Sequence, residues 1–162
     1  MAITDRAVAL STLARRLGER LDFLPLLLAR LTVGYVFVHS GWGKLHHLPD
    51  VIEYFRGLGI PAPELQAPLS ASTELIAGTL VLLGLLTRVA SLPLVVIMLV
   101  ALGTAKREEI ESLNALFGLV EYVYIVLLVH LVVKGGGAAS LDALLGRRFA
   151  ASPSAATPAT VA

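Results

Sequence analysis

Four charged residues interrupt the apolar stretches of this sequence and are its strongest candidates for chemistry. Arg30 and Lys44 belong to the first stretch, Glu74 to the second and Glu121 to the last. A charge in a low-dielectric interior is costly, so it is usually retained where a partner meets it or where it serves an ion, a proton or a ligand. Two carboxylates placed together need a cation or a shared proton, because like charges raise one of their pKa values. Arg30 and Lys44 can provide that cation.

The stretches that carry these residues are long enough to cross a lipid bilayer. A hydrocarbon core of about 30 Å requires about 20 residues of α-helix at a rise of 1.5 Å per residue. Hydrophobic residues make up 56% of the 162 residues, far more than in an average soluble protein. We therefore predict an all-α fold, an integral membrane four-helix bundle in one domain at 21–148. The predicted spans are about 21–44, 68–86, 89–105 and 114–133.

The segments outside and between these spans differ in composition. Residues 1–20 place arginines between leucines and valines at helical spacing, which predicts an amphipathic helix on the cytoplasmic membrane surface, with a basic tail as the alternative. Residues 45–67 are too polar to cross the bilayer and predict a short helix at 49–55 that covers one end of the bundle. From 149 to 162 the chain carries no charge and is predicted to be a disordered tail.

Depth along the predicted spans places the polar residues relative to one another. With the outer boundary at 43, 68 and 114, Glu74 and Glu121 both lie about 10 Å deep and Arg30 lies about 20 Å deep. A polar pocket is therefore expected in the outer half of the bundle, and one carboxylate is expected to pair with Arg30 through its long side chain. The predicted members of this pocket are Arg30, Tyr35, His39, Lys44, Glu74 and Glu121.

Glycines share the helix face of the two cations. Steps of three, four and seven from Arg30 reach Gly34, Phe37, Gly41 and Lys44, so we expect this stripe to face the bundle. The alternative interpretation of the charged residues is a purely structural network that sets the helix register.

Metal and haem sites are not predicted. The chain contains no cysteine, so it cannot form a thiolate zinc site or hold an iron–sulfur cluster. His39 and His130 differ in estimated depth by about 18 Å, which is too far for one haem iron. His46 and His47 are adjacent in a connection, and two such residues alone are a weak metal signal.

The distribution of Lys and Arg predicts the orientation. If both termini are cytoplasmic, eight basic residues lie on the inner side and four on the outer side, and this bias favours termini on the cytoplasmic side. The inner set is Arg6, Arg15, Arg16, Arg20, Arg88, Lys134, Arg147 and Arg148, and the outer set is Lys44, Arg56, Lys106 and Arg107.

The order of these residues resembles a known family. Arg30, Gly34, Gly41 and Lys44 are followed by Glu74, Gly78, Gly84 and Arg88, and after a glycine-rich stop by Ser140, Leu141 and Asp142. This order is similar to the DoxX family, over about 21–148. The resemblance implies a small four-helix protein of the prokaryotic cytoplasmic membrane, related to the DoxD subunit of thiosulfate:quinone oxidoreductase. It implies functional roles for Arg30, Lys44 and Glu74.

The function expected from this resemblance is that of a membrane subunit of a quinone-linked or thiol- and sulfur-related redox system. No intrinsic cofactor is expected, although a quinone could occupy the pocket, and no catalytic residue is assigned. The expected partners are the lipid bilayer and either a soluble redox enzyme or a second copy of the chain. A net charge of +1 gives no basis for a nucleic-acid partner. The alternatives are a non-enzymatic membrane scaffold and a small transporter or proton pathway through Glu74 and Glu121.

Overall fold

The computed structural model describes residues 15, 18 and 21–150, and all regular structure in this part of the chain is helical. The all-α prediction is therefore confirmed for the described residues. Most of the predicted N-terminal helix at 1–20, and the tail beyond 150, lie outside them. The helices are α2 (Leu24–His46), α3 (Leu48–Gly57), α4 (Pro63–Leu83), α5 (Thr87–Gly103), the 3-10 turn η1 (Arg107–Glu109), α6 (Leu113–Gly118), α7 (Val120–Lys134) and α8 (Leu141–Ala150).

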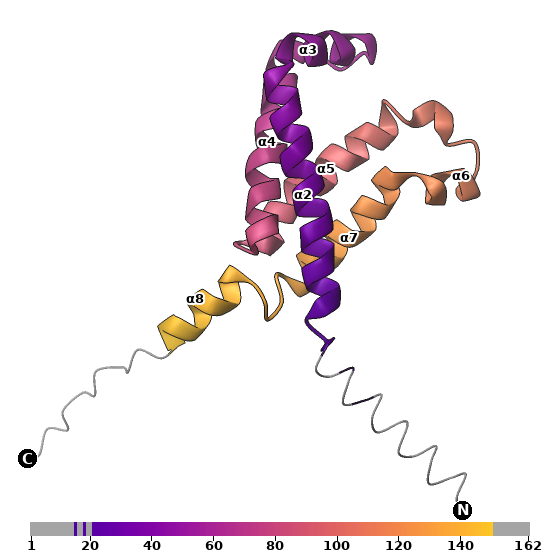
Figure 1. Cartoon of the computed structure of the whole chain (residues 1–162). Helices are drawn as coiled ribbons and strands as arrows, with labels where there is room; N and C mark the ends of the chain where they lie inside the picture. The colour runs from indigo at the N-terminus through magenta and orange to yellow at the C-terminus, as the bar shows by residue number, and fades with distance from the viewer. Residues whose placement is uncertain (1–14, 16–17, 19–20, 151–162) are drawn as a thin grey trace, which may run out of the picture.

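Helices α2 and α4 run side by side and form the most closely packed pair (Figure 1). Glycines make this approach possible, because a Cβ added at Gly41 would lie 2.5 Å from the Leu75 nitrogen, and one at Gly34 would lie 2.7 Å from the Leu82 Cα. Arg30, Gly34, Phe37 and Gly41 are all buried on this face. The predicted bundle-facing stripe on the first helix is thus confirmed.

Helix α3 lies across the upper end of α2 and α4 in Figure 1. It was predicted at 49–55 and spans Leu48–Gly57. Arg56 connects it to the start of α4, because its guanidinium donates to Glu53 within α3 and, at 2.7 Å, to Glu64. The hydrogen bond to Glu64 and the nearby charge of Glu53 raise the pKa of Arg56.

Helices α5 and α7 form the second pair, and they diverge from α2 and α4 toward the upper part of Figure 1. Gly84 and Leu86 both adopt left-handed backbone angles in the turn before α5, with φ of +73° and +49°. This turn allows α5 to start at Thr87, two residues before the start of the span predicted at about 89–105. Ser91 lies inside α5 and donates to the Thr87 carbonyl at 2.8 Å.

The last predicted span is divided in the structure. Leu119 has an extended backbone, with φ −75° and ψ 133°, and separates the short helix α6 from α7. Because of this break α7 has only 15 residues. Helix α5 is also short, with 17 residues. Among the described residues, only α2 is both long and apolar enough to cross a membrane by itself on length and composition. The four-span arrangement therefore remains a prediction.

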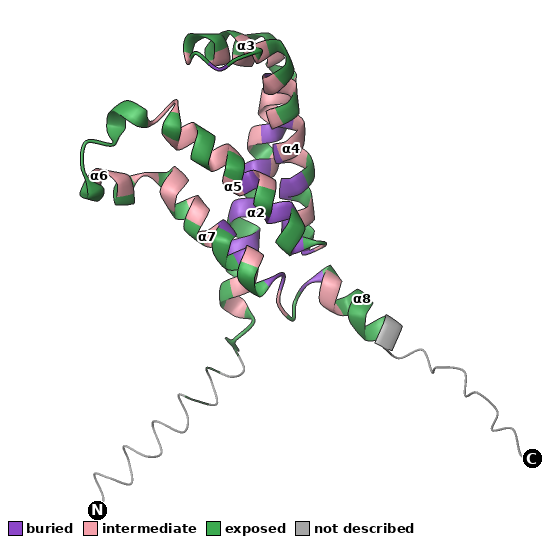
Figure 2. Cartoon of the chain, turned by 180° about the vertical axis from the view of Figure 1, so that it is seen from behind, coloured by how far each residue is buried: buried purple, intermediate pink, exposed green. Residues whose placement is uncertain are grey.

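The buried residues gather where α2, α4, α5 and α7 meet, as Figure 2 shows. Phe37, Leu94 and Leu128 are almost fully buried there. Large apolar side chains also cover the outside of each of these helices, including Leu28, Ile76, Leu92 and Val126, which are all at least half exposed. An exterior of this kind is suited to contact with lipid.

Candidate functional site

Glu74 is the most deeply buried carboxylate in the described part of the chain, with no exposed surface. Lys44 Nζ donates to Glu74 Oε1 at 2.5 Å, and the Ser70 hydroxyl donates to the same oxygen at 3.4 Å. The Ser40 hydroxyl donates to Glu74 Oε2 at 2.7 Å. The carboxylate thus has one cationic and two neutral donors. Removing a charge from water is offset only when its lone pairs are satisfied in this way.

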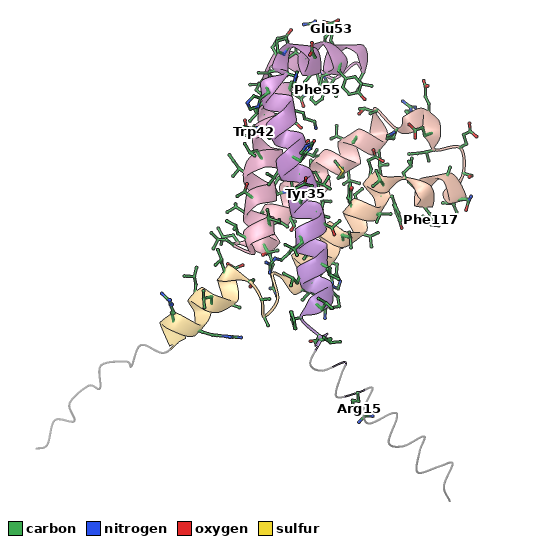
Figure 3. The ribbon with its side chains drawn as sticks, in the orientation of Figure 1. Arg15, Tyr35, Trp42, Glu53, Phe55 and Phe117 are labelled. Atoms are coloured by element: carbon green, nitrogen blue, oxygen red, sulfur yellow. The ribbon has the colours of Figure 1, made fainter. Side chains whose placement is uncertain are left out.

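A pocket of about 760 Å³ lies beside this ion pair. Helices α2, α3 and α4 form one side of it, and α5 and the start of α7 form the other. Ser40, Lys44 and Ser70 line the pocket, so the donors that hold Glu74 are also accessible from it. Most of the remaining lining is apolar, from Phe37, Phe55, Ile97 and Met98 among others, and Figure 3 shows Phe55 beneath α3.

Glu121 reaches the same pocket from the second position of α7. Its Oε2 is buried and has no hydrogen-bond partner among the described residues. Lys106 also lines the pocket and donates to Glu109 at 2.8 Å. The hydrogen bond to Glu109 is the main reason that the pKa of Lys106 is raised, and the charge of Glu121 adds a smaller effect. The pocket therefore combines an apolar lining with an ion pair on one side and an unpaired carboxylate oxygen on the other.

Tyr35 and His39 lie outside this pocket, so their predicted place in it is wrong. Tyr35 is 64% exposed and stacks on His39, with ring centroids 6.1 Å apart. Trp42 continues this exposed face of α2 and packs against His46 (Figure 3). Depth along a helix predicted these positions, but depth does not say which way a side chain points. The face of the helix decides that, and Tyr35 is five residues from Arg30 and therefore on another face.

Arg30 belongs to the opposite end of the bundle. Its Nη1 donates to the carbonyls of Gly136 and Ala139 at 2.6 and 2.9 Å, and Nε donates to that of Val81 at 3.2 Å. A weaker contact of 3.4 Å joins Nη2 to the Leu82 carbonyl. The predicted ion pair between Arg30 and Glu74 or Glu121 is therefore wrong. The guanidinium is instead held by carbonyls from the last turn of α4 and from the loop after α7, where the helix dipole favours a cation.

Ser40 and Ser70 are site residues that the sequence analysis missed. Ser40 precedes Lys44 by four residues and Ser70 precedes Glu74 by four, so helical spacing places each on the face of the charged residue that follows. That spacing was an available signal. Tyr124 lines the pocket and lies near Phe37, with ring centroids 6.2 Å apart. Within the described residues, no cluster of three His, Asp or Glu side chains is arranged to hold a metal ion.

A family model and several known proteins match the part of the chain that contains Lys44 and Glu74. The DoxX family model matches residues 25–107, which include α2 to α5 and the pair Lys44 and Glu74. The membrane protein Rv3486 of Mycobacterium tuberculosis is 35% identical over 75% of this chain and 82% of its own length. CatD of Bacillus subtilis, whose name carries a provisional assignment as an oxidoreductase, is 33% identical over 72% of this chain and 83% of its own. The inner membrane protein YqjF of Escherichia coli is 26% identical over 81% of this chain and 99% of its own. No solved structure matches the chain.

Proposed function

The chain belongs to the DoxX family of membrane proteins, and we propose that it is the membrane subunit of a quinone-linked or sulfur-related redox system. In this proposal a quinone, or a sulfur compound of similar size, binds in the pocket beside Lys44 and Glu74. The observation that carries the proposal is the pocket itself, which joins an apolar lining to a buried ion pair. The oxidoreductase name of the CatD relative supports the same direction.

The volume and lining of the pocket suit an apolar ring with polar oxygens. Ligand sites typically enclose about 300 to 1,000 Å³ and have mostly apolar walls with a few placed polar groups. Lys44 directs one of its three donors to Glu74, which leaves donors for a ligand oxygen. Phe37, Phe55 and Tyr124 supply aromatic surface for a ring.

The electrons of such a reaction would come from a partner. The sequence has no cysteine, so the chain itself cannot carry out thiol–disulfide exchange or ligate an iron–sulfur cluster through thiolates. A soluble redox enzyme at the membrane surface is the partner that we propose. The chain would then provide the membrane anchor and the site at which the lipid-soluble ligand is held.

Occupancy of the pocket gives a direct test. Full-length protein extracted in mild detergent is expected to retain quinone at a near-stoichiometric level, measured by mass spectrometry of the extracted lipids. Ala101→Phe adds a ring to the pocket lining and is expected to lower the retained quinone at least about fivefold, because ligand and ring would occupy the same volume.

Leu99→Phe is the matched control, since Leu99 is on the same helix but 54% exposed and does not line the pocket. It is expected to retain the wild-type amount. Equal retention by wild type and Ala101→Phe would contradict the pocket as the site. Co-purifying proteins without any quinone would favour the scaffold alternative.

The proposed location is the bacterial inner membrane, with four spans and both termini in the cytoplasm. YqjF and YphA of Escherichia coli are both named inner membrane proteins. In this arrangement α2, α4, α5 and the α6 and α7 segment cross the bilayer, and the end with Arg30 faces the cytoplasm. At that end Arg88 lies in the first turn of α5 and Lys134 is the last residue of α7. Arg147 and Arg148 lie in α8, so four basic residues favour the cytoplasmic side for this end.

Reporter fusions test this orientation. A fluorescent protein joined after Ala162 is expected to be bright and alkaline phosphatase at the same point inactive, because each reporter works on only one side of the membrane. A second pair of fusions at Glu111, in the connection between α5 and α6, is expected to give the opposite result. If both fusion points gave the same result, this would contradict the proposal that the segment of α6 and α7 crosses the bilayer.

A further inference from the structure

A second pocket lies at the opposite end of the bundle from the one described above. It has a volume of about 470 Å³ and is bounded by the start of α5, the end of α7 and the loop that leads to α8. None of its lining residues belongs to the first pocket. Its charged members are Arg88, Lys134 and Asp142.

The two cations of this second pocket line the same cavity without an acidic partner among the described residues. A Cβ added at Gly135 would lie 3.2 Å from Arg88 Nε, so the Arg88 side chain passes directly over the residue that follows Lys134. Neither cation forms a salt bridge with a described residue. Two cations that line one pocket favour an anion as the ligand that it binds.

Asp142 does not fill that role, because its carboxylate is directed elsewhere. Its two oxygens accept from the Leu86 and Thr87 backbone N–H groups, at 2.9 and 3.3 Å. Asp142 thus caps the first turn of α5, where the helix dipole already balances its charge. The lining of the second pocket keeps a net charge of +1.

A buried hydroxyl at the same place also lacks a partner. Thr87 is completely buried and lines the second pocket, and its Oγ1 forms no hydrogen bond within the described residues. The glycine loop keeps the space around it open, since a Cβ at Gly136 would lie 2.8 Å from this Oγ1. A hydroxyl of this kind is usually satisfied in a native protein. Its lack of a partner is an observation independent of the two cations.

We propose that this second pocket binds the phosphate group of an anionic phospholipid, held by Arg88 and Lys134 with Thr87 as an additional donor. Guanidinium and ammonium groups are the side chains that bind phosphate most strongly. Basic pockets between membrane helices on the cytoplasmic side are suited to anionic headgroups. Free inorganic phosphate offers the same chemistry, so the experiment separates the two sources.

The test uses full-length protein in detergent and native mass spectrometry with phosphatidylglycerol, phosphatidylcholine or inorganic phosphate added in turn. Wild type is expected to retain phosphatidylglycerol preferentially. The double variant Arg88→Gln and Lys134→Gln is expected to bind it at least about tenfold more weakly, because two charge-assisted contacts are lost.

The matched control is the double variant Arg147→Gln and Arg148→Gln, which removes the same amount of positive charge from α8, outside the second pocket. Its apparent affinity is expected to stay within about threefold of wild type, because exposed charges outside a site are screened by salt. Equal loss in both double variants would overturn the proposal in favour of diffuse surface charge. Preferential stabilisation by inorganic phosphate, with no retention of phosphatidylglycerol, would identify free phosphate as the ligand and overturn the lipid assignment.

Thr87→Val provides a second measurement that does not depend on removing charge. It keeps the shape of the side chain and removes a buried hydroxyl that has no partner, so the protein is expected to fold at least as well without lipid. Phosphatidylglycerol is expected to bind it several-fold more weakly. Unchanged binding would remove Thr87 from the site, and unchanged binding in the Arg88 and Lys134 variant as well would refute the site as a whole.

Discussion

Replacing Arg30 by Met is expected to lower the free energy of unfolding by about 3 kcal/mol or more, because up to four buried or partly buried carbonyls lose their donor at once. The Met side chain keeps much of the apolar stem of Arg30, so the loss reports on the guanidinium. Two of these carbonyls end α4 and two belong to the loop after α7. The guanidinium therefore joins α2 to one segment that is 51 to 52 residues away in the sequence and to another that is 106 to 109 residues away.

Space around the guanidinium is as specific as its hydrogen bonds. A Cβ at Gly84 would lie 2.6 Å from Arg30 Cζ, and φ at Gly84 is +73°. Only glycine adopts that angle without strain while leaving room for the guanidinium. Arg30→Lys is expected to be intermediate, because an ammonium has three donors and lacks the planar fork that reaches both sets of carbonyls.

Thermal unfolding in detergent measures this effect. Arg147→Met is the control, since Arg147 is an exposed cation on α8 and is expected to leave the melting temperature almost unchanged. An Arg30→Met protein that melts with this control would contradict the role of the carbonyls. In that case the guanidinium would have to be solvated instead.

Gly41→Ala is expected to cost about 1–3 kcal/mol of stability, the typical result of overfilling a closely packed interface. The added Cβ would lie 2.5 Å from the Leu75 nitrogen and 2.7 Å from the Ala71 oxygen. Both are backbone atoms, so no side-chain rotation relieves the contact and α2 must move away from α4. Lys44 lies one turn further along α2, so its contact with Glu74 is expected to lengthen as well.

Gly43→Ala is a matched control on the same helix, because a Cβ at Gly43 meets no atom within 4 Å. Alanine is the better helix former, so this variant is expected to be equal to wild type or more stable by about 0.5–1 kcal/mol. The melting temperature and the retained quinone should both fall in Gly41→Ala. Neither should fall in Gly43→Ala. Equal behaviour of the two variants would show that the helices adapt without cost.

The sequence by itself predicted the helical class and the face of the first long helix that packs against a neighbouring helix. Hydrophobic runs report burial or lipid contact whatever the partner, and glycines at three- and four-residue steps mark a face that another helix can approach. Gly34 and Gly41 were recognised on this basis, and both are buried in the structure. The same local rules predicted the short helix α3. The order of the charged and glycine residues indicated the family to which the chain belongs.

The tertiary structure alone decided which charges meet. Depth along separate helices placed Glu74 and Glu121 at one level and offered both Arg30 and Lys44 as partners, but it contains no information on rotation about the helix axis. In the structure Lys44 reaches Glu74, while Arg30 binds backbone carbonyls at the other end. Backbone carbonyls are present at every residue and carry no sequence signal, and they become available only where a helix ends. The partner of Arg30 therefore depends on where α4 and α7 end in space, which is a property of the folded chain.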